Sequence, residues 1–337
     1  MRRGLVVMLA SCLALTGSVA ASAGTSMEKV VGGGGTQYWP SSNGTFVAYS
    51  NYFRRDYNAL AMNEATGHRV RANARGTSGV LGSFIQGTSQ FIFQQYGDRS
   101  DLYFFDVSNR QRTKAPSAVN GIGWVYWPAG SQEHILYMRA THRFHTRSLM
   151  LFDRSTKTNR KLIDDIGGKT VFPGYVGARY AAWTTCGSEA CFVFVYDTTT
   201  QTTTKLPTPA SKSSYAPVID EATDQIYFVR SADRCGVDVT IRVGALGSDQ
   251  STTVATLPRG IDTGWTLSLT SNATSGFQDL YFERWECKDQ RGDVWAIRSV
   301  DDPGTMRGQD VGPAAAGPYG HPVERTMPTA GAERRPG

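Results

Sequence analysis

Six short runs of aromatic and β-branched residues recur along this chain at nearly constant spacing, and this period constrains the fold more than any other feature. Their starts are 45, 44, 45, 46 and 54 residues apart. The runs are FVAY from Phe46, FIFQ from Phe91, ILYM from Ile135, YAAW from Tyr180, IYFV from Ile226 and LYFE from Leu280. A period of about 40 to 50 residues is typical of arrays or rings built from one repeated supersecondary unit.

Each run is one of four short strands that repeat together. A second strand-like run follows after a polar loop, as in SDLYFFDVSN from Ser100 and CFVFVYDTTT from Cys191. A weaker third run follows a turn rich in Asn, Asp, Gly and Thr, and a further segment precedes each FVAY-type run. We label the strands a, b, c and d in chain order, so that the FVAY-type run is strand b. No helical period is visible beyond the first residues of the chain.

Six four-stranded units predict an all-β fold, a six-bladed β-propeller of four-stranded antiparallel blades. Stacking the blades around an axis buries the apolar faces that a single sheet would expose. The alternative, a pair of β-sandwiches, would not require a constant period. We expect the blades to cover residues 36–75, 78–116, 119–164, 169–207, 213–258 and 262–300.

The two ends of the propeller are expected to meet in the last blade. The sequence DDPGTMRGQDVG after the sixth strand c is a poor strand, whereas SMEKVV (26–31) is a passable one. We therefore expect residues 26–31 to form the outer strand of blade 6 and to close the ring. Residues 312–337 are rich in Pro, Gly and Ala, which predicts a disordered tail after a propeller domain spanning 24–311.

The first 23 residues have the pattern of a secretory signal peptide, with a basic start, an apolar stretch and the small-residue cleavage site Ala21-Ser22-Ala23. The alternative is a lipoprotein, because LASC, ending at Cys12, resembles a bacterial lipobox. No later segment approaches the roughly 18 apolar residues of a membrane span. The sequence therefore predicts a soluble mature protein that is secreted or held in the cell envelope.

The charge of the chain is mildly positive. Removing the leader lowers the formal charge from +6 to +4, because Arg2 and Arg3 leave with it. There is no Lys/Arg run and no RNA-binding motif, which argues against a nucleic-acid partner. The 27 Arg and 8 Lys residues are typical of a GC-rich bacterial genome. We expect a monomer that needs no cofactor.

The tripeptide YWP occurs twice, at Tyr38-Trp39-Pro40 and at Tyr126-Trp127-Pro128. The copies are 88 residues apart, which is two periods of the repeat. We expect each proline to end an inner strand before the a–b turn, because proline interrupts a sheet ladder. This interpretation makes the two tryptophans part of the architecture and not a paired site.

The first unit, YWPSSNGTFVAYSNYFRRDYNALAMNEATG, resembles the WD40-like repeat of the TolB C-terminal propeller family. That repeat runs from an aromatic residue through Ser-Pro-Asp-Gly to an apolar strand b, a charged b–c loop and a strand c ending in Asp. Units 1 and 3 keep Trp-Pro, and Asp106, Asp153 and Asp197 end strand c in units 2 to 4. The resemblance covers roughly residues 36–300 and implies a propeller. It implies no function, because propellers include enzymes and scaffolds.

The b–c loops are the most promising place for a binding site. In a propeller they share one face with the d–a connections, while the a–b and c–d turns share the other, and here those turns are bland, as in SSNG and TTTQTTT. The b–c loops concentrate charge, which favours them as a binding face. The candidate binding residues are Arg54, Arg55, Arg99, Arg139, His142, Arg143, His145, Arg147, Arg234 and Arg284. The segment RATHRFHTR (139–147) admits three interpretations: an anion site, a general base at His142, or a solvated loop paired with neighbouring acids.

Four cysteines remain after the leader, and an even number in an exported chain favours disulfides. Cys186 and Cys191 flank the blade 4 b–c turn, and Cys235 and Cys287 lie in the b–c loops of adjacent blades. We expect these two local pairings, whereas pairing Cys186 with Cys235 or Cys287 would span a greater distance. CGSEAC alone lacks the further ligands of a zinc site, so no metal is assigned.

No G-x-S-x-G elbow, HExxH or P-loop is present, so no catalytic residue is assigned. The leading hypothesis is an exported, non-enzymatic propeller that binds a protein, a peptide or a cell-envelope glycan through its charged loops. The alternative is an exported hydrolase or lyase whose active site lies at the top of the central channel. Three or more acidic or histidine side chains converging there would favour the enzyme.

Overall fold

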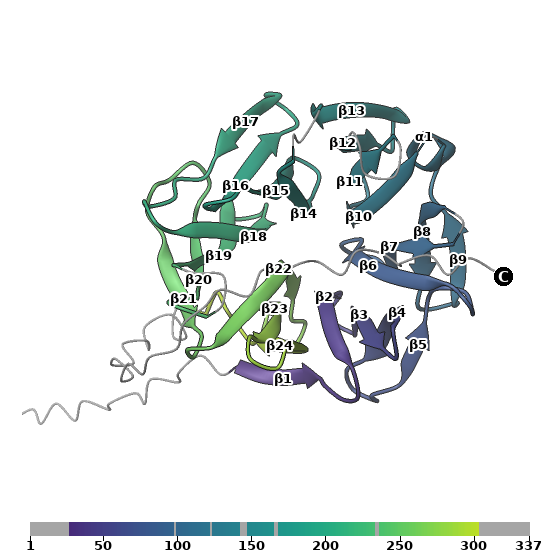
Figure 1. The fold of residues 1–337 in the computed structure, drawn as a ribbon, viewed down its shortest axis with the longest axis horizontal. Coiled ribbons are helices and arrows are strands. Elements are labelled where there is room, and N and C mark those ends of the chain that lie inside the picture. The colour runs from purple at the N-terminus through teal and green to yellow at the C-terminus, as the bar shows by residue number, and fades with distance from the viewer. Residues whose placement is uncertain are drawn as a thin grey trace, which may run out of the picture.

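The computed structural model describes residues 27–302, apart from positions 98, 122, 142–146, 165–167 and 233–235. Six four-stranded antiparallel sheets are arranged in a ring around a central axis (Figure 1). This arrangement confirms the predicted all-β six-bladed propeller. The predicted leader and the predicted tail (312–337) lie outside the described residues.

Blades 1 to 3 each contain four strands that follow one another along the chain. Blade 1 consists of β2 (Thr36–Ser42), β3 (Phe46–Phe53), β4 (Asp56–Asn63) and β5 (Arg69–Arg71). Blade 2 consists of β6 (Ser78–Phe84), β7 (Gln90–Tyr96), β8 (Ser100–Asp106) and β9 (Gln111–Lys114). Blade 3 consists of β10 (Trp124–Gly130), β11 (His134–Ala140), β12 (Arg147–Asp153) and β13 (Thr158–Ile163).

Blades 4 to 6 repeat this order, except that the outer strand of blade 6 comes from the start of the chain. Blade 4 consists of β14 (Thr170–Val176), β15 (Tyr180–Cys186), β16 (Cys191–Asp197) and β17 (Thr202–Lys205). Blade 5 consists of β18 (Ser213–Asp220), β19 (Gln225–Ser231), β20 (Thr240–Ala245) and β21 (Thr252–Thr256). Blade 6 consists of β22 (Ile261–Ser271), β23 (Gln278–Glu286), β24 (Arg291–Ile297) and β1 (Met27–Val31).

A single helix occurs in the described part of the chain. It is α1 (Ser117–Asn120), in the d–a connection between blades 2 and 3, and the sequence did not predict it. The Asn120 side chain fixes this turn, because its amide bonds the backbone N–H and C=O of Leu102. No helix among the described residues is long and apolar enough to cross a membrane.

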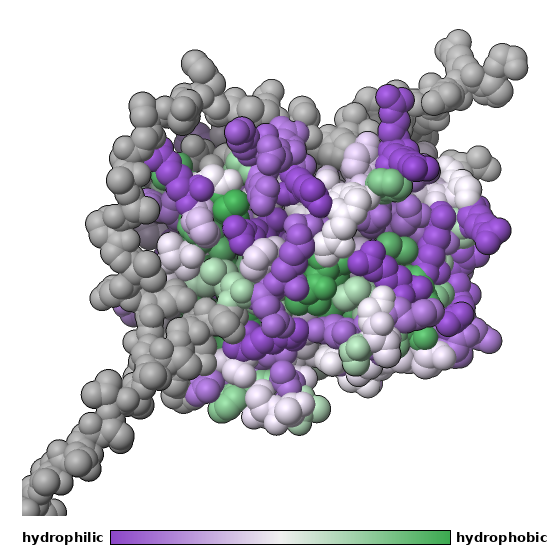
Figure 2. Space-filling model, turned by 90° about the horizontal axis from the view of Figure 1, so that it is seen from below, coloured by the Kyte–Doolittle hydropathy of each residue, from purple (hydrophilic) through white to green (hydrophobic). Residues whose placement is uncertain are grey.

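The ring is closed by β1, as predicted. This strand pairs antiparallel with β24, with Met27 opposite Ile297 and Val31 opposite Val294. The sheet order of blade 6 is therefore β1-β24-β23-β22, and the two ends of the propeller lie side by side (Figure 1). Seen from the side of β1, the outer surface is largely hydrophilic, with smaller apolar areas between the polar side chains (Figure 2).

Arg298, directly after β24, joins the closing strand to its surroundings. Its guanidinium pairs with Glu28 of β1, with Asp279 of blade 6 and with Glu64 of blade 1, the last two at 2.8 Å. The Tyr281 hydroxyl accepts a further bond from Arg298 and donates to Glu64. One side chain therefore links the outer strand, the rest of blade 6 and the next blade.

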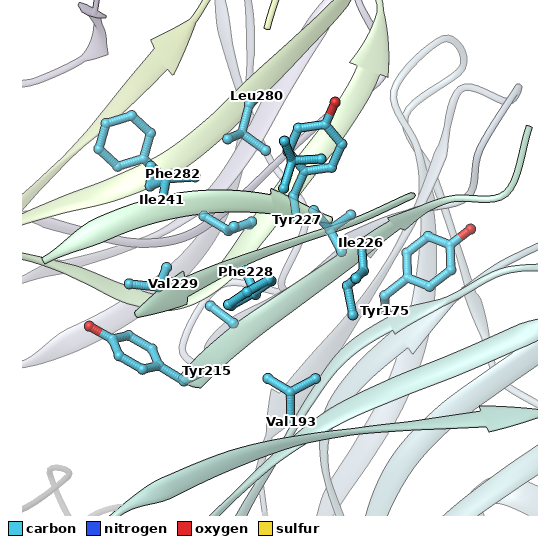
Figure 3. Close-up of a cluster of buried hydrophobic side chains, with 14 of the residues drawn as sticks. Tyr175, Val193, Tyr215, Ile226, Tyr227, Phe228, Val229, Ile241, Leu280 and Phe282 are labelled. Atoms are coloured by element: carbon cyan, nitrogen blue, oxygen red, sulfur yellow. The ribbon is translucent and has the colours of Figure 1, made fainter. Parts of the chain in front are cut away.

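The six apolar runs of the sequence are the b strands, which lie between two neighbouring strands and between two neighbouring blades. In β19, for example, Ile226, Tyr227, Phe228 and Val229 are all at most 1% exposed. Figure 3 shows part of this core, in which Ile226 and Phe228 belong to the same buried cluster as Tyr175 of blade 4 and Phe282 of blade 6. A strand covered on both faces reads as a continuous apolar run, which explains why these runs do not alternate.

Every inner strand is interrupted by a β-bulge at a similar level. The residues left without a strand partner are Trp39-Pro40, Gly82-Ser83, Trp127-Pro128, Gly174, Ala216-Pro217 and Gly264-Trp265-Thr266. The expectation that each YWP proline ends its strand is wrong, because β2 continues to Ser42 and β10 to Gly130. A bulge tolerates proline because the ladder is already interrupted there.

Buried polar side chains of strand b connect three of the six inner strands to the preceding blade. In each case the side chain accepts a hydrogen bond from a backbone N–H of the next inner strand. The pairs are Ser50 with Leu81 (2.7 Å), Gln94 with Trp127 (3.2 Å) and Thr184 with Ala216 (3.0 Å). All three polar residues are 0% exposed. Blade 3 carries Met138 at this position, and the next inner strand carries Pro173, which has no N–H to satisfy. A polar side chain is therefore not needed at this position in blade 3.

Replacing Thr184 with valine is expected to lower the free energy of unfolding by about 1–3 kcal/mol, because the buried Ala216 N–H loses its acceptor while the side-chain shape is kept. Urea unfolding would measure this loss. The matched control is Thr185→Val, because the buried Thr185 hydroxyl has no hydrogen-bond partner among the described residues. We expect that control to change stability by less than about 0.5 kcal/mol. Equal losses in the two variants would contradict the role given to Thr184.

Candidate binding surface on the upper face

We call the face formed by the b–c and d–a connections the upper face, and the face formed by the a–b and c–d turns the lower face. Four of the predicted binding residues, His142, Arg143, His145 and Arg234, lie outside the described residues. The other six predicted residues belong to several blades and divide into arginines held against the protein and arginines exposed to solvent.

Three of the predicted arginines are engaged within the fold. Arg139 donates to the carbonyl groups of Ala118 and Val119 and lies over the ring of Tyr137, with 5.3 Å between its guanidinium carbon and the ring centroid. Arg284 lies over the Trp295 ring at 4.4 Å. Arg147 donates to the backbone carbonyl of Lys169. These side chains stabilise the walls of their blades. Arg54, Arg55 and Arg99 are instead exposed.

The blade 1 hairpin presents Arg54 and Arg55 at its tip. Phe53 pairs with Asp56, so the two arginines form a two-residue loop. Both have positive φ angles, 52° and 70°, the geometry of a type I′ turn that normally selects Asn-Gly. The Arg54 guanidinium carbon lies 5.0 Å from the centroid of the Phe53 ring. At 43%, Phe53 is the most exposed large hydrophobic side chain in the described part of the chain.

Aromatic rings gather beside this hairpin. Tyr52 and Tyr57 face each other across the two strands, with ring centroids 4.7 Å apart. Tyr38 of the inner strand lies 6.1 Å from Tyr57 and 5.7 Å from Trp285 of blade 6. All four residues are partly exposed. We call Tyr38, Tyr52, Tyr57 and Trp285 the blade 1 aromatic patch; its rings come from two blades that adjoin where the ring closes.

The phenols of Tyr38 and Tyr57 stay protonated at neutral pH. Burial raises the pKa of Tyr57 to about 12 and also raises the pKa of Tyr38, and the Glu283 carboxylate acts in the same direction on both. Glu283 is 3% exposed in β23. The patch therefore offers neutral hydroxyl groups and apolar ring faces, while the positive charge is confined to the hairpin tip.

A stack of aromatic rings crosses the central channel below the patch. Phe172 of blade 4 lies 5.2 Å from Trp127 of blade 3 and 4.3 Å from Trp265 of blade 6, measured between ring centroids. Blades 3 and 6 are opposite in the ring, so the stack spans the axis. Phe172 is 4% exposed, whereas both tryptophans are partly exposed. Only the Trp-Pro pair of unit 3 marks these residues in the sequence, where it is interpreted as part of the architecture.

A cavity of about 60 Å³ lies on the lower side of the bulges and is lined by all six inner strands. Among the described residues, its lining contains Trp39, Trp127 and Trp265 and no Asp, Glu or His. Two buried carboxylates, Asp262 and Glu283, lie nearer the upper face in blade 6, and Asp262 accepts hydrogen bonds from the Tyr215 hydroxyl and from a backbone N–H. Within the described ranges, no group of three or more His, Cys, Asp or Glu residues could hold a metal ion.

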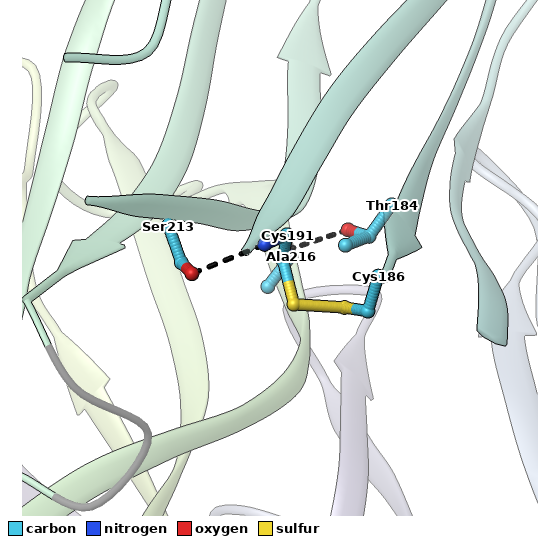
Figure 4. The surroundings of a disulfide bond; sticks show 5 residues. All are labelled: Thr184, Cys186, Cys191, Ser213 and Ala216. Atoms are coloured by element: carbon cyan, nitrogen blue, oxygen red, sulfur yellow. Dashed lines mark hydrogen bonds between the residues drawn. A yellow bond between two sulfur atoms is a disulfide. The ribbon is translucent and has the colours of Figure 1, made fainter. Parts of the chain in front are cut away.

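The Cys186–Cys191 disulfide is confirmed and ties the ends of β15 and β16 on the upper face. Figure 4 shows it beside the next inner strand, where the Cys191 N–H donates to Ser213 Oγ and the Ala216 N–H donates to Thr184. Cys287 takes part in a disulfide. Cys235, its predicted partner, lies outside the described residues, so that pairing stays a prediction.

No protein-family model and no curated protein matches this sequence. Among solved structures, the chain is similar to a putative TolB from Agrobacterium tumefaciens, with a TM-score of 0.55 and 11% identity over 78% of this chain and 90% of that one. A luciferin-regenerating enzyme has a TM-score of 0.53 and 10% identity over 81% of this chain and 95% of that one. The β-propeller domain of the Trilobed protease from Pyrococcus furiosus has a TM-score of 0.50 and 8% identity over 79% of this chain and 96% of that one. The chain thus has a TolB-like six-bladed fold. Because the sequence identities are this low, the similarity shows the fold alone and indicates no function.

Proposed function

We propose that this chain is an exported, non-enzymatic propeller that binds a protein, a peptide or a cell-envelope glycan through its upper face. The observation that carries the proposal is the blade 1 hairpin, which places Arg54 and Arg55 in left-handed backbone conformations beside an exposed Phe53. The composition of the hairpin and the blade 1 aromatic patch favours a protein or peptide among these partners.

The hairpin tip is unfavourable for folding alone. A left-handed conformation costs a side-chain-bearing residue roughly 1–2 kcal/mol, and Asn-Gly would avoid much of this cost. Local strain of this kind persists mainly at functional sites. The exposed Phe53 ring adds apolar surface that folding does not bury. Together these features support a role in contacts with another molecule.

The surrounding residues have the composition of an interaction hot spot. Tyr, Trp and Arg are the residue types that contribute most to protein interfaces, because they bury a large area and still form polar contacts. Arg54 and Arg55 form no ion pair with any described residue. An acidic group on the partner would complement them, and an apolar side chain would cover Phe53.

The alternative, a hydrolase or lyase acting at the channel, would need several acidic or histidine side chains there. Among the described residues, the buried carboxylates nearer the upper face are Asp262 and Glu283, and both belong to blade 6. This distribution favours binding over acid–base chemistry at the axis.

The double variant Arg54→Asn/Arg55→Gly tests the proposal. It removes both guanidinium groups and the backbone strain, so we expect stability to stay equal or to rise by about 1 kcal/mol while partner binding falls at least about tenfold. The measurement is quantitative capture from an envelope extract of the source organism, followed by titration of the retained partner.

The matched control is Arg110→Gly/Lys157→Gly. These two residues are also exposed, basic and left-handed, with φ angles of 60° and 58°, but they lie in c–d turns of the lower face. We expect this control to retain the same partner as the wild-type protein. If the hairpin variant and the control retain the same set of molecules, the upper-face proposal fails.

A further inference from the structure

A second potential site lies in the lower half of the central channel and is independent of the proposed function. We infer that this cavity binds a single neutral sugar ring, such as the terminal residue of an uncharged glycan, with its apolar face against the exposed tryptophans. The inference rests on the conformation of two tryptophans, on polar groups available to a ligand and on the absence of charge among the described residues of the cavity lining.

Trp39 and Trp127 occupy the bulges of blades 1 and 3 with positive φ angles of 50° and 46°. The equivalent bulge residue of blade 5, Ala216, has φ 53° and is 0% exposed. The left-handed conformation is therefore part of the architecture, but an indole is not required there. A bulky side chain in this region is unusual and strained. Both indoles remain partly exposed in the channel, and Trp127 also packs against the core beside Phe172.

Three polar groups at the cavity are available to a ligand. The Thr266 hydroxyl is buried and has no hydrogen-bond partner among the described residues. The Trp39 and Trp127 indoles also line the cavity and are partly exposed, so their N–H groups are accessible to a ligand. Other hydroxyl groups in the lining are already used, since Ser41 bonds Ser268 and the Phe84 N–H. A buried polar atom without a protein partner usually bonds water or a ligand.

The chemistry of the lining selects a neutral ligand. No charged side chain in the described part of the chain lines the cavity, so an ion would lose its hydration without compensation. A sugar ring has an apolar C–H face for an indole ring and oxygen atoms that accept from indole N–H groups. The cavity of about 60 Å³ has room for roughly four to six water molecules, which the hydroxyl groups of one sugar ring can replace.

The shape of the channel favours the end of a ligand over a chain that passes through it. The rings of Trp127, Phe172 and Trp265 cross the axis on one side of the cavity. On the other side Gln86, an exposed residue of the blade 2 a–b turn, also lines the cavity, so entry is from the lower face. An extended peptide would need a groove open at both ends, whereas a terminal ring needs one opening.

The test is a titration of the full chain with methyl glycosides of glucose, galactose, mannose and N-acetylglucosamine, followed by calorimetry and saturation-transfer NMR. We expect saturable binding of at least one of them. Two conservative variants probe the site, because Trp39→Phe keeps a ring but loses the N–H, and Thr266→Val keeps the shape but loses the hydroxyl. Each is expected to weaken binding about five- to tenfold.

Controls separate this site from the upper face. Arg54→Asn/Arg55→Gly is expected to bind the sugar as the wild-type chain does, whatever happens to its protein partner. Methyl glucuronoside, which carries a carboxylate, is expected to bind at least about tenfold more weakly than the methyl glucoside. The inference would be overturned if no glycoside bound saturably, or if Thr266→Val and Trp39→Phe both bound the sugar as tightly as the wild-type chain. Displacement of the sugar by a proline-rich peptide that binds more tightly would also overturn it.

Discussion

Replacing Arg298 with alanine is expected to lower the free energy of unfolding by about 3–5 kcal/mol, because it leaves carboxylates around a buried site without their counter-charge. Asp279 has a side chain only 3% exposed and Glu64 one 19% exposed, and both pair with this guanidinium at 2.8 Å. The substitution weakens the contact of β1 and the rest of blade 6 with blade 1, because Arg298 pairs with residues of all three. Urea unfolding, together with limited proteolysis of the N-terminal strand, would measure it.

Two variants sharpen this result. Arg298→Lys keeps the charge but cannot reach three carboxylates with one planar fork, so we expect an intermediate loss. Arg291→Ala is the matched control, because the exposed Arg291 donates to a single backbone carbonyl, that of Gly33, in the same blade. It should change stability by less than about 1 kcal/mol. A loss no greater for Arg298→Ala than for Arg291→Ala would show that the closure does not depend on the ion cluster.

Replacing Phe172 with alanine is expected to cost about 3–5 kcal/mol, since it removes a ring that is 4% exposed and packed between two tryptophans. The near-ultraviolet circular dichroism of the stacked indoles should change as well. Thermal and urea unfolding measure the stability, and Phe172→Leu, which keeps most of the volume, should lose clearly less.

Phe53→Ala is the control for phenylalanine truncation, because Phe53 is 43% exposed and lies at a hairpin tip. Its stability should change by less than about 0.5 kcal/mol. If Phe172→Ala unfolded at the same urea concentration as Phe53→Ala, the aromatic stack would contribute nothing to the stability of the fold.

The repeat and the ring closure could be read from local patterns. An apolar run every 45 residues or so marks the b strand of each blade, because that strand is covered on both faces. The strand 27–31 was predictable because blade 6 lacked a fourth strand and the start of the chain supplied one. Both conclusions need only hydrophobic period and a count of strands.

The candidate sites were only partly predictable. Arg54 and Arg55 were recognised as charged loop residues, but their left-handed conformations and the rings of Tyr38 and Trp285 nearby became visible only in the fold. Arg139 was predicted as a binding residue on the same grounds, but its side chain donates to the backbone carbonyl groups of Ala118 and Val119. Composition cannot distinguish an exposed arginine from one that packs on its own blade, because both occur in charged loops.

The sequence by itself determined the number of blades, their order and the strand that closes the ring, because these follow from the hydrophobic period and a count of strands along the chain. Only the tertiary structure decided what faces the axis. Trp127, Phe172 and Trp265 are 45 and 93 residues apart, about one and two periods, and come from three different blades. Their contact depends on the radius of the ring and on bulges that turn each inner strand, and these properties arise only when all six blades pack together.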